Sequence, residues 1–90
     1  MNFDREEWKE MLQLADDMDP TTRMLLYQYS MLFDSQGRAT TQLKVLSKTI
    51  GLRETEVRKH LLKAKDAQWL TPIKLDGRKG YQATLPAELV

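Results

Sequence analysis

The chain has 90 residues, 41% of them hydrophobic and 30% charged, which is typical of one small globular domain and leaves no room for a second. It contains no cysteine, and this excludes disulfides and thiolate metal sites. The net charge of +1 is the sum of an acidic part and a basic part of the chain, which meet at Ser35. Residues 1–35 hold three Lys or Arg against eight Asp or Glu, a net of −5, whereas residues 36–90 hold eleven against five, a net of +6. An anionic partner is therefore expected at the basic part.

The N-terminal residues carry no sign of a targeting segment. Asp4, Glu6 and Glu7 make the start acidic, and no apolar run is long enough for a secretion signal or a membrane span. Together with the lack of cysteine, this predicts a cytoplasmic protein without membrane contact. We expect residues 1–90 to form a single domain.

The first predicted element is a helix from about Asp4 to Met18. Its apolar residues recur at spacings of three and four, with Asp4 as the cap and Phe3 packed on Trp8. They are Trp8, Met11, Leu12, Ala15 and Met18. This helix, residues 1–18, is either a homodimer contact through Phe3, Trp8, Met11 and Leu12 or a cover for its own domain.

The second predicted helix, from Pro20 to about Asp34, is apolar on most sides and should be the central core helix. A turn at residues 35–37 and a short extended connector at 38–40 follow. Thr40 or Thr41 can then cap a third helix that contains Leu43 to Ile50, and Gly51 can end it in a left-handed conformation.

The fourth predicted helix, about Glu54 to Trp69, is the most basic element. If Val57, Leu61 and Ala64 face the core, then Thr55, Arg58, Lys59 and Leu62 lie on the outer face. From Ile73 onward apolar and polar residues alternate, so the apolar period changes to two. This predicts a two-stranded hairpin over residues 73–85 with its tip at Asp76 to Gly80. Pro72 suits a strand start or an edge.

Two stretches of the sequence carry a family resemblance. Residues 46–61 read Leu-Ser-Lys-Thr-Ile-Gly-Leu-Arg-Glu-Thr-Glu-Val-Arg-Lys-His-Leu, and residues 67–70 read Ala-Gln-Trp-Leu. They resemble winged helix-turn-helix regulators of bacteria, plasmids and phages. The stretches Thr-Thr-Arg-Met-Leu-Leu (21–26) and Gly-Arg-Ala-Thr (37–40) are similar to the first helix and connector of replication-type members. The sequence departs from the family pattern at Arg53, where a capping Ser is usual, at Glu56 and at Gln68, where Gly is usual.

The resemblance covers about residues 20–85. It implies an α+β fold, mostly helical: a winged helix-turn-helix with an extra N-terminal helix and a C-terminal two-stranded wing. It also implies that the helix at about 54–69 enters the major groove of double-stranded DNA while the basic wing at about 73–85 contacts the duplex beside it.

The residue types support a DNA interface independently of the resemblance. The guanidinium fork of Arg58 can bond two acceptors of a guanine, Thr55 and Lys59 are further base-reading candidates, and the hairpin tip can reach a minor groove or the phosphate backbone. Alternatively, the basic face is an ordinary solvated surface. The expected DNA-binding residues are Arg38, Thr41, Lys44, Lys48, Arg53, Thr55, Arg58, Lys59, Lys63, Arg78 and Lys79.

No catalytic constellation is visible in the sequence. Ser30, Ser35 and Ser47 have no base and orienting acid at a recognisable spacing, and His60 is the only histidine, so we expect no enzyme, metal or cofactor. The leading hypothesis is a sequence-specific transcriptional regulator that binds double-stranded DNA as a homodimer, with no small-molecule ligand. The alternatives are a replication or partition accessory factor, and a protein-protein adaptor that uses the same fold without binding DNA.

Overall fold

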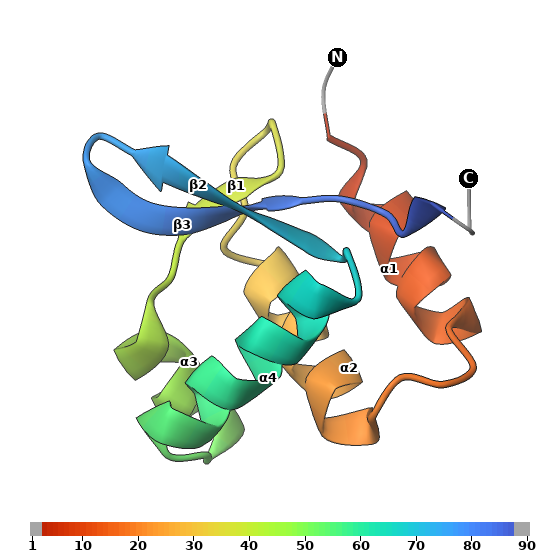
Figure 1. The fold of residues 1–90 in the computed structure, drawn as a ribbon, viewed down its shortest axis with the longest axis horizontal. Coiled ribbons are helices and arrows are strands. Elements are labelled where there is room, and N and C mark those ends of the chain that lie inside the picture. The colour runs from red at the N-terminus through yellow and green to blue at the C-terminus, as the bar shows by residue number, and fades with distance from the viewer. Residues whose placement is uncertain (1–2, 88–90) are drawn as a thin grey trace.

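A computed structural model describes residues 3–87 (Figure 1). About half of the chain is helical, and the described residues form four helices and one three-stranded antiparallel sheet. The predicted α+β class is therefore confirmed. None of these helices is both long and apolar enough to cross a membrane. In chain order the elements are α1 (Arg5–Leu14), α2 (Pro20–Ser30), β1 (Arg38–Thr40), α3 (Leu43–Ile50), α4 (Glu54–Asp66), β2 (Leu70–Leu75) and β3 (Arg78–Ala83).

The sheet has the strand order β1-β3-β2, so the last strand is the central one. The predicted two-stranded hairpin thus gains a third strand, because the connector at residues 38–40 pairs with β3. The two backbones approach closely at Gly80: a Cβ on Gly80 would lie 2.4 Å from the carbonyl oxygen of Ala39. Pro72 lies on the edge strand β2, as predicted, where its missing N–H leaves no ladder bond unmade.

The hairpin turn is shorter than the sequence analysis predicted. It consists of Asp76 and Gly77 alone, which have φ angles of 50° and 79°. Positive φ at both positions gives a turn whose twist matches that of the two strands, so β3 begins at once. Arg78 and Lys79 therefore belong to a strand and not to a loop tip.

The hydrophobic core lies between the helices and one face of the sheet. Trp8 and Trp69 meet edge to face with their ring centroids 6.1 Å apart, and the Trp8 indole N–H donates to the Thr84 carbonyl at 2.8 Å. Trp8 is 3% exposed and Leu12 is fully buried within their own chain. Within this chain α1 therefore covers its own domain, the alternative that the sequence analysis also gave, and a homodimer contact of this helix stays a prediction. Phe3 and Met11 are partly buried against the same core.

Helices α1 and α2 end earlier than the predicted Met18 and Asp34, and an arginine of each helix binds the end of the other. Arg23 of α2 donates to the carbonyls of Leu12 at 2.8 Å and Ala15 at 2.6 Å. Arg5 of α1 donates to the carbonyls of Ser30 and Phe33, both at 2.7 Å. These bonds satisfy carbonyls that a helix end leaves without partners, and they fix the two helices to each other.

Several predicted caps are confirmed and one is wrong. The Asp4 carboxylate accepts from the Glu7 N–H at 3.1 Å, and Gly51 ends α3 with a φ of 79°. At the start of α3, however, the cap is Gln42 with a left-handed φ of 52°, and not Thr40 or Thr41. Helix α4 ends at Asp66, before the predicted Trp69, and Gln68 adopts the left-handed conformation, with a φ of 70°, in the place of the usual glycine.

Candidate nucleic-acid interface

Helix α4 presents the two faces that its sequence predicts. Val57, Leu61 and Ala64 are buried at 1% exposure or less. The outer face is exposed along its length and includes Thr55, Arg58, Lys59 and Leu62. The basic side chains of this helix are therefore available to a partner.

A cleft of about 690 Å³ lies between α4, the loop that leads into α3, and the hairpin of β2 and β3. We call it the Arg58 cleft, because Arg58 of α4 lines it together with Arg78 and Lys79 of β3. Among residues 3–87, no acidic side chain lines it. Three cations from elements separated in the chain thus meet around one cavity, on the side of the molecule where the hairpin and α3 lie in Figure 1.

A second cleft, of about 450 Å³, continues along the hairpin. We call it the Lys74 cleft. It shares Thr41, Leu62, Lys79 and Tyr81 with the first and adds two more cations, Lys65 and Lys74. Its lining, too, contains no acidic side chain from the part of the chain that the structure describes. The two clefts therefore form one continuous basic surface.

The hairpin register places two like charges opposite each other. Lys74 of β2 pairs directly with Lys79 of β3, and both side chains line the Lys74 cleft. Like charges directly opposite in an antiparallel pair destabilise the sheet. A bound anion would remove this repulsion, so the pair is unfavourable in the free protein and favourable in an anionic complex.

The loop under the Arg58 cleft is held by hydrogen bonds to its neighbours. The N–H of Thr41 donates to the Lys79 carbonyl at 3.2 Å, and the Thr41 hydroxyl donates to the same oxygen at 3.3 Å. The Tyr29 hydroxyl donates to the carbonyls of Ala39 and Thr40, at 3.1 and 2.7 Å. Burial raises the pKa of Tyr29 above its usual range, so the hydroxyl keeps its proton for these bonds. Thr41 thus joins β3 to the start of α3, as well as lining both clefts.

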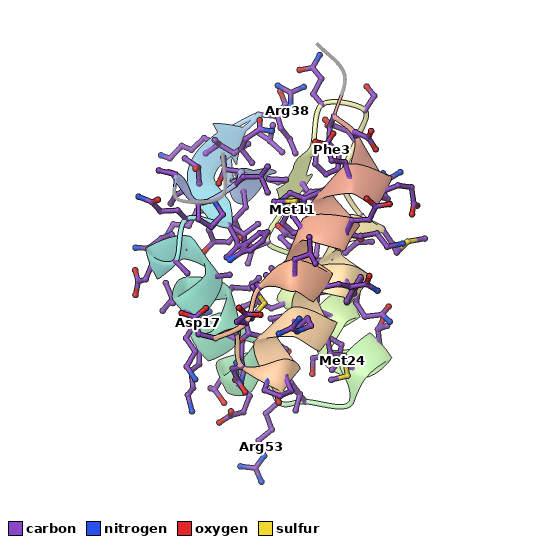
Figure 2. The ribbon with its side chains drawn as sticks, turned by 90° about the vertical axis from the view of Figure 1, so that its right-hand side faces the viewer. Phe3, Met11, Asp17, Met24, Arg38 and Arg53 are labelled. Carbon is purple, nitrogen blue, oxygen red and sulfur yellow. The ribbon has the colours of Figure 1, made fainter. Side chains whose placement is uncertain are left out.

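Seven of the eleven predicted DNA-binding residues do not line these clefts. Arg38 lies 3.4 Å from the Asp34 carboxylate, and Lys63 Nζ lies 3.7 Å from the Asp19 carboxylate. Arg53 projects from the turn between α3 and α4, and Figure 2 shows Arg38 and Arg53 at opposite ends of the molecule. These three residues therefore lie apart from the cations of the two clefts, and their contact with DNA stays a prediction. Lys44, Lys48, Thr55 and Lys59 are exposed on α3 and α4, outside the lining of both clefts.

His60 is buried, at 6% exposure. Its Nδ1 lies 2.7 Å from the Thr22 hydroxyl and 3.2 Å from the Asp19 carboxylate, and its Nε2 lies 4.0 Å from the Glu56 carboxylate. Desolvation opposes the charge of Asp19, but the nearby Thr21 N–H, the charges of Lys63 and His60 and the Thr22 hydroxyl outweigh it, and the pKa of Asp19 is lowered. The cluster attaches α4 to the start of α2, and Glu56 lines neither cleft.

Lys65 and Lys74 are interface candidates that the sequence analysis missed. A signal for Lys74 was present: an Asp-Gly pair that forms a two-residue turn places residue 75 opposite 78 and residue 74 opposite 79. The predicted five-residue tip, Asp76 to Gly80, does not give this register. No comparable local signal places Lys65 at the hairpin, because that contact depends on how α4 packs on β2.

No protein-family model, no curated protein and no solved structure matches the chain. The function must therefore be argued from the basic surface, its geometry and the order of the elements.

Proposed function

We propose that the protein is a sequence-specific double-stranded DNA-binding protein of the winged helix-turn-helix class, and that it regulates transcription by occupying its site. The order of elements supports the class: a core helix, a short strand, two helices joined by a turn at Gly51, and a hairpin whose second strand pairs with the first short strand. In this class α3 and α4 are the helix-turn-helix and the β2-β3 hairpin is the wing.

The observation that carries the proposal is the convergence of Arg58, Arg78 and Lys79 on the Arg58 cleft without an acidic neighbour in its lining. An ordinary solvated surface mixes both signs of charge, whereas a duplex requires cations grouped along its phosphates. The Lys74–Lys79 pair adds a second argument, because it is unfavourable unless an anion lies between the two side chains.

In the proposed complex, α4 lies in the major groove with Arg58 directed at a guanine, whose O6 and N7 can accept both arms of the guanidinium. Arg78, Lys79 and Lys74 of the hairpin contact the backbone or the adjacent minor groove. Binding as a homodimer to paired half-sites would supply the specificity that one small module lacks. The dimer contact would then lie outside the buried face of α1.

Titration of fluorescent duplexes at several salt concentrations tests the proposal. We expect affinity to fall steeply with salt, and the slope to decrease by roughly two when Arg78→Ala and Lys79→Ala are combined, since each phosphate contact contributes about 0.9. Arg58→Ala should instead lower the preference for a duplex selected from a random pool by about 1–3 kcal/mol. Arg53→Ala is the matched control, because Arg53 lies away from both clefts, and it should change neither quantity.

Binding that does not weaken with salt, or equal loss of affinity in the Arg53 control and the hairpin variant, would refute the proposal. An adaptor that recognises another protein would give the first of these results.

A further inference from the structure

One large apolar side chain is exposed within the basic surface. Leu62 of α4 is 44% exposed, and it lines both the Arg58 cleft and the Lys74 cleft. The cations that line these clefts with it are Arg58, Lys65, Lys74, Arg78 and Lys79. The other large hydrophobic side chains that are exposed in residues 3–87 line neither cleft; they are Leu14, Met24, Met31 and Val45.

A leucine at this position needs an apolar partner once a polyanion covers the surface. Phosphates would desolvate the side chain without offering it an apolar contact, and the C–H groups of deoxyribose offer no contact that depends on the base sequence. Among the groups that base pairs display in the major groove, the apolar one is the C5 methyl group of thymine. Leu62 therefore fits a thymine edge better than any other part of a duplex.

We propose that Leu62 is a specificity-determining residue that contacts the 5-methyl group of a thymine in the bound site. This inference rests on the proposed function and deepens it, because it assigns a second base-reading position besides Arg58. Leu62 follows Arg58 by four residues, which places both on one face of α4 about 6 Å apart along its axis. Since base pairs are stacked about 3.4 Å apart, the thymine lies within about two base pairs of the guanine that Arg58 reads.

The experiment compares thymine with uracil, which lacks only the methyl group and keeps every hydrogen-bonding atom. The probe is a fluorescent duplex selected from a random pool by the parent protein. Each thymine of this duplex is replaced by deoxyuridine in turn, and the affinity is measured by fluorescence anisotropy. At one thymine near the guanine that Arg58 reads, we expect the replacement to weaken binding by about fourfold, the effect of one buried methyl group.

Leu62→Ala removes the proposed partner of the methyl group. This variant should bind the thymine duplex more weakly than the parent does, and it should bind the thymine and uracil duplexes equally. Leu14→Ala is the matched control: Leu14 is exposed on α1, outside both clefts, and this variant should keep the full fourfold preference for thymine. Far-UV circular dichroism of both variants checks that the fold is retained.

The inference is overturned if no thymine shows a methyl effect, or if Leu62→Ala keeps that effect. In either case a duplex that is still bound in a salt-dependent way leaves the proposed function standing, and Leu62 is then available to a protein partner. If no duplex is bound at all, both the proposed function and this inference fail.

Discussion

Many charged side chains of this protein bind their own chain. Arg5 and Arg23 donate to the ends of neighbouring helices, and Arg38 pairs with Asp34. Lys63 pairs with Asp19, which lies far from it in the sequence. Such partners are set by packing, so composition and spacing alone could not separate these side chains from the cations of the two clefts. Arg58 could be identified from the sequence, because the helical period of Val57, Leu61 and Ala64 fixes the face on which it lies.

The carboxylate of Asp34 should make the stability of the protein depend on pH. Hydrogen bonds from the N–H groups of Arg38, at 3.0 Å, and Gln36, at 2.8 Å, together with the charge of Arg38, lower the pKa of Asp34 below its ordinary 3.8 despite some desolvation. Its ionised form therefore stabilises the fold above about pH 4, and this contribution is lost as the pH falls through the lowered pKa.

Asp34→Asn should consequently lower the midpoint of urea unfolding at pH 7, while at about pH 2 variant and parent should nearly coincide. Unfolding followed by the fluorescence of the buried Trp8 and Trp69 measures the midpoints. Glu10→Gln, on the exposed side of α1, serves as the control and should show no such pH-dependent difference. If the unfolding midpoint of the Asp34→Asn variant were lowered as much at acid pH as at neutral pH, the ionised carboxylate would not be the source of the stabilisation.

Among the elements, the hairpin carries a stability cost that the proposed function explains. Lys74→Thr removes one member of the Lys74–Lys79 pair and introduces a β-branched residue suited to a strand. The free energy of unfolding should rise by about 0.2–1 kcal/mol. The same change should weaken duplex binding and lower its salt slope by about one.

Lys79→Thr provides the matched variant, because it relieves the same repulsion but removes a cation that lines both clefts. It should stabilise the free protein to a similar extent, and the double variant should gain little more than either single one. Urea titrations measure the free energy of unfolding, and fluorescence anisotropy measures the affinity for a duplex. Lower stability in both single variants would show that the pair is not repulsive in the free protein.

The existence of the elements could be predicted from the sequence better than their ends. Local sequence patterns were sufficient to predict the Asp4 cap, the end of α3 at Gly51 and the presence of α4, because each of these features depends on neighbouring residues. The carbonyls at the ends of α1 and α2 bind arginines of the other helix, and no local sequence pattern contains these long-range contacts. Gln42 and Gln68 adopt left-handed conformations, which favour glycine. A glutamine at either position does not indicate such a conformation, so the sequence could not predict it. The pairing of β1 with β3 is likewise a long-range contact.

For the whole molecule, the acidic and basic parts of the sequence become two sides of the structure. Helix α1, with its acidic first turn, lies on one side in Figure 1, and the hairpin with its cations lies on the other. A duplex would therefore be attracted to the hairpin side and repelled by the side of α1. This polarity orients the protein before any specific contact is made.

The buried face of α1 predicts the result of a truncation. Removing residues 1–18 would expose the part of the core that Trp8 and Leu12 cover, and it would free the carbonyls at the end of α2 that Arg5 binds. Loss of a buried tryptophan alone costs about 3–5 kcal/mol, a large share of the stability of a small domain. We expect the truncated chain to lose its cooperative thermal transition in circular dichroism. A truncated chain that melts cooperatively and stays monomeric would instead favour α1 as a separable dimer contact.

The central position of β3 also determines when the protein can fold during its synthesis. Both neighbours of β3, the strands at residues 38–40 and 70–75, leave the ribosome before it does, and neither has its ladder partner until residues 78–83 follow. A chain that ends at Gly77 lacks β3 and so cannot form the sheet, and the surface that joins helix to hairpin requires the last strand. A mutation that halts synthesis there would leave a helical fragment with an unpaired strand edge and no cleft.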